Sequence, residues 1–233
     1  TDKTVEVLYS ANKDTAYKVE HYTENLDGEY TLADTDNLTG TTDTLTNAIA
    51  KSYEGFTVQE FDQLNIDGDG ETVVKIYYTR NSYNLEINYI YDKDQTTAAA
   101  SYGITLKYEE SYSETSPLIT GYTADKLVVS GKMPHYNLIN VVTYAANKDT
   151  AYKVEHYTEN LDGAYTLYAT DDLIGETDTL TNASAKIITG FTVKSFNQKN
   201  IAGDGTTVIR IEYTRNAYQL VYKIDGEVYR TFD

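Results

Sequence analysis

The sequence of 233 residues contains no cysteine, no tryptophan, one methionine and only two prolines. Without cysteine, disulfide frameworks, thiolate zinc sites and cysteine nucleophiles are excluded. Basic residues are also few, 19 against 36 acidic ones, so the formal net charge is -17. Such an acidic surface repels phosphate backbones, which argues against nucleic acid as a partner. No apolar run approaches the roughly 18 residues of a membrane span, so no membrane insertion is expected.

What the chain does contain is an internal duplication. The segment AYKVEHYTENLDG occurs at residues 16–28 and again at 151–163, and both GFTV and YTRN recur at the same offset of 135 residues. Aligned at that offset, residues 11–83 and 146–218 are identical at 53 of 73 positions without a gap. We call these segments the first repeat and the second repeat, since self-similarity of this length indicates a tandem array.

A different segment, residues 84–145, separates the repeats and is called the middle segment. The stretch NVVTYAANKD at 140–149, around its end, is similar to the start of the chain, and SYNLEINYIYD at 82–92, around its beginning, is similar to AYQLVYKIDGE at 217–227. The expected organisation follows from these likenesses. Residues 1–10 are the terminal strand of a preceding module, 11–83, 84–145 and 146–218 are three modules, and 219–233 are the start of a further module.

Charge varies between the two repeats while their apolar positions do not. The first repeat carries 14 acidic and 5 basic residues, whereas the second carries 10 and 7. A function that depends on charge would require both repeats to keep that charge. The difference therefore indicates that the charged residues lie on a solvent-exposed face, where they vary between repeats, while the core residues are kept.

Apolar residues alternate along most segments, which predicts half-buried β-strands. In TVVKIYYTR the inward set is Val74, Ile76 and Tyr78, whereas Tyr77 corresponds to Glu212 and faces water. Asp-Gly pairs at 27–28, 162–163 and 225–226 predict hairpin turns. The best helical candidate is the short stretch from Leu45 to Tyr53, in which threonine and asparagine are unfavourable.

The modules are small, and only Arg80, Asn81 and Ser82 join the first repeat to the next module. Modules of about 65 to 70 residues lie near the lower end of independent stability, so neighbours are expected to be coupled. Strands of about eight residues span roughly 26 Å, so three modules placed end to end give on the order of 80 to 100 Å. The sequence thus predicts a monomeric rod.

The motifs resemble those of known surface repeats. The middle segment combines Tyr89, Asp92, Tyr112, the run ITGYTADKLVVSG at 119–131 and VVTY at 141–144, a layout similar to mucin-binding-protein (MucBP) repeats. The flanking YKVEHY, GFT and YTRN motifs resemble tandem repeats of Gram-positive cell-surface adhesins. The stretch from Tyr218 resembles the opening of Listeria–Bacteroides, internalin B-type repeats.

The resemblance implies a fold and a location. The expected fold class is mainly β, with α+β, β-grasp-like modules of small antiparallel or mixed sheets in an elongated tandem array. The expected location is extracellular, on a protein attached to the cell wall. The resemblance also implies adhesion, in some cases to host mucin glycans or surface proteins, and it brings no catalytic residue.

Residues that suggest chemistry have plain structural alternatives. His21 and His156 are one position in two repeats, and His135 lies in a Met-Pro-His-Tyr loop, but no nucleophile motif or zinc motif accompanies them. Asp67 and Asp69 suggest a calcium loop, yet calcium needs six to eight oxygen ligands, and the second repeat keeps only Asp204. Asp92 and Asp94 also suggest a calcium loop, and a plain turn is again the structural alternative.

Two further candidates are specific to surface modules. A Lys–Asn isopeptide crosslink could join Lys18 to Asn81, and Lys153 to Asn216, if their strands pair. Exposed tyrosines, namely Tyr30, Tyr77 and Tyr165, could contact sugar rings, although tyrosines also form cross-strand ladders.

The sequence therefore favours a non-enzymatic stalk segment of a bacterial surface adhesin that projects a distal binding domain. The alternative is a module that itself binds mucin-type glycans or a host protein. No catalytic, cofactor-binding or metal-ligating residue is assigned, and no cofactor is expected.

Overall fold

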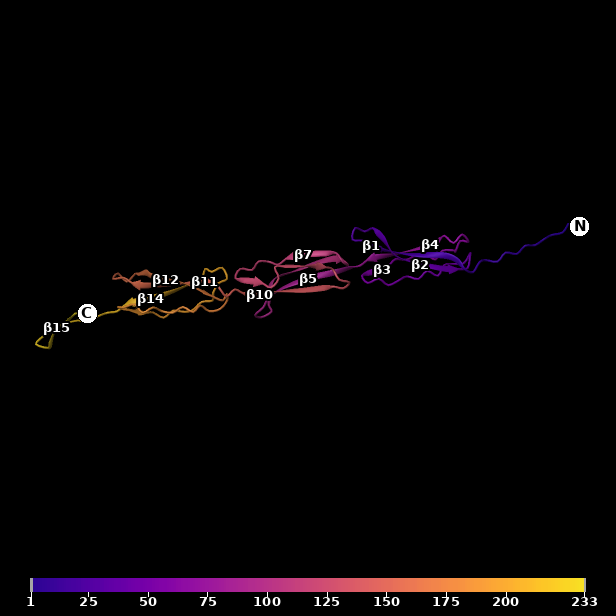
Figure 1. The fold of residues 1–233 in the computed structure, drawn as a ribbon. Coiled ribbons are helices and arrows are strands. Elements are labelled where there is room, and N and C mark those ends of the chain that lie inside the picture. The colour runs from indigo at the N-terminus through magenta and orange to yellow at the C-terminus, as the bar shows by residue number, and fades with distance from the viewer. Residues whose placement is uncertain (1, 233) are drawn as a thin grey trace. The chain divides into compact units, whose positions relative to one another are not determined.

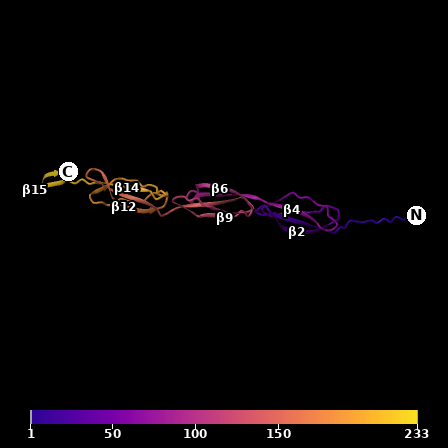
Figure 2. The same cartoon turned by 90° about the horizontal axis from the view of Figure 1, so that it is seen from above.

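A computed structural model describes residues 2–232, in which the chain forms strands and no helix. Figure 1 labels many of the strands along the chain, and Figure 2 shows the same cartoon from above. The mainly β class predicted from the period-two pattern is confirmed. No helix in the described range is long and apolar enough to cross a membrane.

The first repeat forms one mixed four-stranded sheet in the order β2-β1-β4-β3. Its strands are β1 (Thr15–Glu24), β2 (Tyr30–Gly40), β3 (Phe56–Val58) and β4 (Thr72–Arg80). β1 and β2 form an antiparallel hairpin whose turn carries Gly28 at φ +90°, as the Asp-Gly pair predicts. β1 is parallel to β4, with Val19 opposite Val74. A parallel pair requires a crossover, here residues 41–71.

One face of this sheet is buried. The core contains the predicted inward set of β4, two side chains from β1 and two from the crossover: Tyr17, Val19, Ala48, Ile66, Val74, Ile76 and Tyr78. Tyr77 points to the other face and is partly exposed, as expected from its replacement by Glu212.

The crossover contains no helix, so the helical candidate at Leu45 to Tyr53 is wrong. Its backbone groups find side-chain partners instead of partners four residues away. The amide of Ala48 donates to Gln63 Oε1 at 2.8 Å, and Gln63 Nε2 donates to the Ala48 carbonyl at 2.9 Å. The amide of Lys51 donates to the hydroxyl of Tyr78 at 2.7 Å. The mainly β part of the expected fold is therefore confirmed, whereas its α+β, β-grasp-like part is not.

The second repeat has the same topology, β12-β11-β14-β13. Its strands are β11 (Thr150–Glu159), β12 (Tyr165–Gly175), β13 (Phe191–Val193) and β14 (Val208–Arg215). The parallel register is also repeated, since Val154 lies opposite Ile209. Differences at 20 positions thus leave the sheet unchanged, because they fall mainly outside the core.

The middle segment forms a four-stranded sheet of order β6-β5-β10-β8 and a two-stranded sheet, β7-β9. Its strands are β5 (Ser82–Tyr91), β6 (Thr97–Lys107), β7 (Ser111–Thr115), β8 (Tyr122–Ala124), β9 (Val128–Lys132) and β10 (Leu138–Ala146). Leu85, Ile87 and Val142 are almost fully buried. Contacts assign this segment to two compact units. The first unit holds the residues up to Asn88 with Ala100–Thr115 and Val128–Val141, and the second holds the remainder.

The two ends of the described chain have less secondary structure than the repeats and the middle segment. Residues 2–10, expected to be the last strand of a preceding module, form no strand, since no neighbouring strand supplies ladder hydrogen bonds. Residues 219–232 form a hairpin of β15 (Leu220–Ile224) and β16 (Glu227–Phe232), which turns at Asp225 and Gly226 as predicted. The module boundaries themselves stay a prediction.

Candidate functional site

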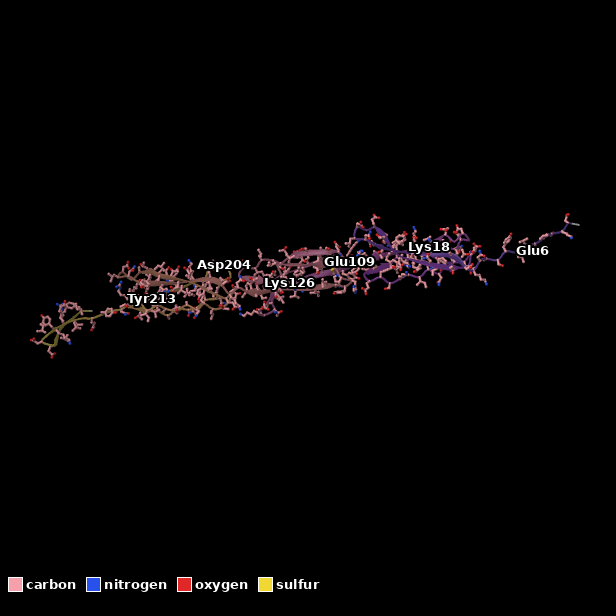
Figure 3. All side chains as sticks on the ribbon, viewed as in Figure 1. Glu6, Lys18, Glu109, Lys126, Asp204 and Tyr213 are labelled. Atoms are coloured by element: carbon pink, nitrogen blue, oxygen red, sulfur yellow. The ribbon has the colours of Figure 1, made fainter. Side chains whose placement is uncertain are left out.

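The most elaborate side-chain arrangement in the first unit lies where the first repeat meets the middle segment. β4 ends at Arg80 and β5 begins at Ser82. The side chain of Arg80 is only 10% exposed. Its Nε donates to the Glu24 carbonyl at 3.0 Å, and its Nη1 donates to the Tyr108 carbonyl at 2.8 Å and pairs with Glu109 at 3.1 Å. We call this arrangement the Arg80 junction, and Figure 3 labels Glu109 at its edge.

Aromatic rings and backbone complete the Arg80 junction. The guanidinium of Arg80 lies 4.8 Å from the ring centroid of Phe56, and Phe56 meets Tyr108 edge to face at 5.9 Å. The amide of Tyr108 donates to the Asn81 carbonyl, and the amide of Asn81 donates to the Gly55 carbonyl, both at 2.8 Å. A Cβ on Gly55 would lie 2.3 Å from the Tyr108 ring, so glycine permits this close approach.

A buried carboxylate closes the junction. Glu24 is 8% exposed, accepts the amide of Arg80 at 2.8 Å and pairs with Lys107 Nζ at 2.7 Å. The hydrogen bond from Lys107, then that from the Arg80 amide, lower the pKa of Glu24 below its ordinary value. The negative form is therefore the one that this junction stabilises.

A cleft of about 730 Å³ lies in the second unit. We call it the tyrosine cleft. It is lined by Tyr91, Asp92, Lys93, Asp94, Thr96, Tyr122, Tyr144, Ala145, Ala146, Lys148, Glu176, Thr177, Asp178 and Thr179. Four carboxylates against two lysines favour neutral or cationic ligands over anionic ones.

Two tyrosines define the aromatic part of the tyrosine cleft. The rings of Tyr91 and Tyr122 lie 4.7 Å apart between centroids. The hydroxyl of Tyr122 donates to Asp178 Oδ2, and this bond to a carboxylate raises the pKa of Tyr122 to about 12. Aromatic faces beside carboxylate oxygens can stack on a sugar ring and accept its hydroxyl protons.

The candidate calcium residues form ordinary turns. Asp69 Oδ1 accepts the amide of Glu71 at 3.0 Å, and Asp204 accepts both the amide and the hydroxyl of Thr206. Asp94 holds Thr96 in the same way. Within residues 2–232, no group of three or more His, Cys, Asp or Glu side chains could hold a metal ion.

The repeated histidines are buried and hydrogen-bonded inside each repeat. His21 is fully buried, with Nδ1 2.8 Å from the hydroxyl of Tyr78 and Nε2 3.1 Å from Asp36 Oδ2. A neutral imidazole that donates from Nε2 satisfies all three groups, since the Tyr78 hydroxyl then donates to Nδ1 and accepts from the Lys51 amide. No solvent path reaches the ring, which a catalytic base would need.

The second repeat reproduces this network with His156, Tyr213, Asp171 and Lys186 at the same distances. In each repeat the lysine and then the histidine lower the pKa of the aspartate. The network joins the crossover to the sheet and therefore has a structural part in both repeats. His135 differs, because it is exposed and contacts the ring of Tyr108 edge to face at 6.3 Å.

The structure does not bring the candidate isopeptide pairs together. β1 and β4 are parallel, and Lys18 lies opposite Val73 rather than opposite the end of β4. Asn81 follows Val73 by eight residues, a distance of about 26 Å along an extended strand. Lys153 lies opposite Val208, so Asn216 is equally remote. Lys18, labelled in Figure 3, is exposed on β1, and Asn81 instead accepts the hydroxyl of Thr57 at 2.7 Å.

The rings of the candidate sugar-binding tyrosines are in contact with neighbouring side chains on the sheet. Tyr77 stacks on Tyr22 at 5.3 Å and meets Tyr30 edge to face at 5.1 Å, which occupies much of its ring surface. In the second repeat Glu212 replaces Tyr77 and pairs with Lys194 and Arg210, which lie over Tyr165 and Tyr157. Both arrangements are cross-strand ladders, which stabilise a sheet.

Sequence reasoning found the short link at Arg80 but missed its partners at residues 107–109. A signal for half of the junction was present, because Glu24, Gly55, Phe56, Arg80 and Asn81 are all identical in the second repeat. It also missed the tyrosine cleft, whose walls come from segments far apart in the chain.

No protein-family profile and no curated protein matches this sequence. Among solved structures, the chain is similar to the type 2 repeat of the mucus binding protein MUB from Lactobacillus reuteri, with 16% identity, 57% of this chain and 100% of that chain covered, and a TM-score of 0.24. It is also similar to Streptococcal High Identity Repeats in Tandem (SHIRT) domains 3-4 from a cell surface protein, with 18% identity, coverage of 57% and 99%, and a TM-score of 0.23.

A longer match is the Bacillus anthracis TIE protein, with 11% identity and a TM-score of 0.40, over 88% of this chain and 51% of that chain. The first two structures are named as repeats of a mucus binding protein and of a cell surface protein, the kinds of protein that the sequence motifs resemble. At TM-scores under 0.5 the likeness goes no further, and it says nothing of what this chain binds.

Proposed function

We propose that this chain is a structural stalk segment of a cell-wall-attached adhesin of a Gram-positive bacterium, exposed outside the cell. The Arg80 junction supports the proposal. A spacer must transmit position from one part of the array to the next, and this junction joins the first repeat to residues 107–109 of the middle segment by a guanidinium, a lysine–carboxylate pair and backbone hydrogen bonds. A flexible linker would make none of these contacts.

The stalk proposal is tested by breaking the junction. The maximum dimensions of the Arg80→Ala and Tyr108→Ala variants, measured by small-angle scattering, are compared with that of Arg210→Ala. This control removes an exposed arginine that is far from the junction in sequence. Small-angle scattering of the unaltered chain is expected to give a maximum dimension on the order of 80 to 100 Å for three coupled modules. A value near that of a compact 26.2 kDa globule contradicts the stalk.

Glycan binding is the second candidate function, and the tyrosine cleft favours it. A volume of about 730 Å³ lies within the usual range of small-ligand sites and would accommodate one or two sugar rings. The ligand class that fits is a neutral host glycan of the mucin type, because the lining is aromatic and acidic. Binding by surface tyrosines outside the cleft has less support, since Tyr30 and Tyr77 contact each other and Lys194 lies over the ring of Tyr165.

Purified mucin and a glycan array, at physiological and at high salt, test this second function. The informative variant is Tyr91→Ala, which removes an aromatic wall of the cleft. The matched control is Tyr77→Glu, a change to the residue that the second repeat already carries at the corresponding position. Binding lost in the first variant and kept in the second supports the cleft. No binding at high micromolar concentration contradicts glycan recognition and leaves the stalk.

A further inference from the structure

The second repeat ends in a copy of the surface that the first repeat uses at the Arg80 junction. Glu159, Gly190, Phe191, Arg215 and Asn216 correspond to Glu24, Gly55, Phe56, Arg80 and Asn81, with identical residues at each position. The local geometry is repeated as well. The amide of Arg215 donates to Glu159 Oε2, and the amide of Asn216 donates to the Gly190 carbonyl, both at 2.8 Å.

The two surfaces differ in how far they are buried by other residues. Arg80 is largely buried, whereas Arg215 is exposed, and Glu159 is more exposed than Glu24. A Cβ on Gly55 would collide with Tyr108, whereas a Cβ on Gly190 meets nothing within 4 Å. A groove of about 280 Å³ lies beside Glu159, Arg215 and Asn216, and its other walls are Asn160, Leu161, Gly163 and Ala217. We call this surface the Arg215 socket.

The residues after the Arg215 socket indicate what belongs in it. At the same offset of 135, Tyr218 and Leu220 correspond to Tyr83 and Leu85, which open β5 of the middle segment. The hairpin β15–β16 therefore corresponds to β5 and the turn after it, because residues 227–232 lie at the offset of 92–97 and β6 begins only at Thr97. Its apolar side chains are uncovered, since Leu220 is 57% exposed whereas Leu85 is 1% exposed.

We propose that the Arg215 socket receives a Lys-Tyr-Glu turn, equivalent to residues 107–109, from a module of the middle-segment type that begins at residue 219 of the same polypeptide. The tyrosine ring lies over Gly190 and its amide donates to the Asn216 carbonyl. The lysine pairs with Glu159, and the glutamate pairs with Arg215. The inference rests on the stalk proposal, because it makes the same junction the repeating unit of the array.

The test compares the same substitution in both repeats and in two chains. One chain is the protein as it is, and the other carries residues 82–145 after Asn216 in place of 217–233. Arg80→Ala and Arg215→Ala are made in each, with Arg210→Ala as a control on the sheet face of the second repeat. The readout is amide hydrogen exchange in the two repeats, which reports the local opening equilibrium.

In the present chain, Arg80→Ala is expected to raise the opening equilibrium of its junction about tenfold or more, because it removes hydrogen bonds from a charged group. Arg215→Ala is expected to have a much smaller effect. In the extended chain the two effects become equal, and Arg210→Ala behaves alike in both chains.

Gly190→Ala provides a second variant that is independent of charge. In both chains it strains a residue held at φ +85°. Only in the extended chain does the added methyl group also block the tyrosine ring, so its effect is expected to be larger there.

The two proposals fail in different ways. The socket proposal is overturned, and the stalk proposal stands, if in the extended chain Arg80→Ala raises the opening equilibrium and Arg215→Ala leaves it unchanged. If Arg80→Ala also leaves the opening equilibrium unchanged, the coupling on which the stalk depends is absent. If sedimentation shows that the present chain dimerises and Arg215→Ala abolishes the dimer, the occupant is a second copy, which also overturns the proposal.

Discussion

At the scale of single residues, the buried histidine network is the most constrained feature of each repeat. His21, Tyr78 and the Lys51 amide are linked by two hydrogen bonds of 2.8 and 2.7 Å. Buried polar groups are stable only when their partners are present. The network therefore fixes the crossover in one position on the sheet, without a helix to hold it.

His21→Phe is expected to destabilise the first repeat by about 1 to 3 kcal/mol, because it leaves the buried hydroxyl of Tyr78 without one partner. The measurement is denaturant unfolding followed by tyrosine fluorescence. Asp34→Ala is the matched control, since the second repeat has Ala169 at that position. Asp34 pairs with Lys51 at an exposed site, so its loss is expected to have little effect. Equal losses in both variants would contradict a special role for the histidine.

The sequence predicted side-chain direction better than strand direction. Val74, Ile76 and Tyr78 are buried as the alternation predicts, because period two fixes which face a side chain takes. The sequence left a Lys18–Asn81 contact open because alternation is the same in parallel and antiparallel strands, and only antiparallel pairing would bring these residues together. Only the length of the crossover carried a signal, since parallel neighbours need a long connection.

At the scale of elements, the crossover shows how a polar segment replaces a helix. Gln63 accepts the Thr46 hydroxyl at 2.8 Å and bonds both backbone groups of Ala48. Gln198 makes the same three bonds in the second repeat. The residues at 45–53 therefore stay irregular rather than helical, which local propensity alone does not reveal.

Gln63→Ala is expected to destabilise the first repeat by about 1 to 3 kcal/mol, because two backbone groups of Ala48 lose their partners. Hydrogen exchange at Ala48 measures the effect directly. Gln59→Lys serves as the control, because the second repeat carries Lys194 there. A protected Ala48 amide in Gln63→Ala would show that water replaces the glutamine side chain without loss.

The Arg80 junction should weaken in acid. The pKa of Glu24 lies below its ordinary value of 4.5, chiefly through Lys107. Its stabilising contribution is therefore complete above about pH 4.5 and disappears as the pH falls through the lowered pKa. Amide exchange at Tyr108, followed from pH 7 to pH 3 with correction for intrinsic rates, measures this.

Glu24→Gln removes the charge, so it is expected to flatten that acid dependence. The matched control is Glu159→Gln, because no ion pair joins Glu159 to a lysine in the described residues. An acid response of Tyr108 that is unchanged in Glu24→Gln would assign the titration to another group.

At the scale of the whole molecule, sequence comparison revealed the duplication but only half of each site. Identity between repeats marks Arg80 and Arg215 equally, yet Lys107 and Tyr108 have no second copy with which to align. The tyrosine cleft was hidden for a related reason. Tyr91, Tyr122 and Asp178 approach one another only through folding, and no short motif contains them.

The parallel pairing of β1 with β4 has a mechanical consequence for a chain held at both ends. These are the first and last long strands of the first repeat, and they pair from Tyr17–Thr72 to Thr23–Tyr78. Tension on the two ends of the repeat pulls these strands in opposite directions along their length, so the ladder is loaded in shear and its hydrogen bonds must fail together. An antiparallel hairpin pulled at its open end would instead unzip one bond at a time.

Single-molecule pulling should therefore give two high-force events of similar size, one for each repeat, because β11 and β14 have the same geometry. Low, gradual unfolding of both repeats would contradict shear loading. A protein without cysteine can in this way resist force through strand direction alone.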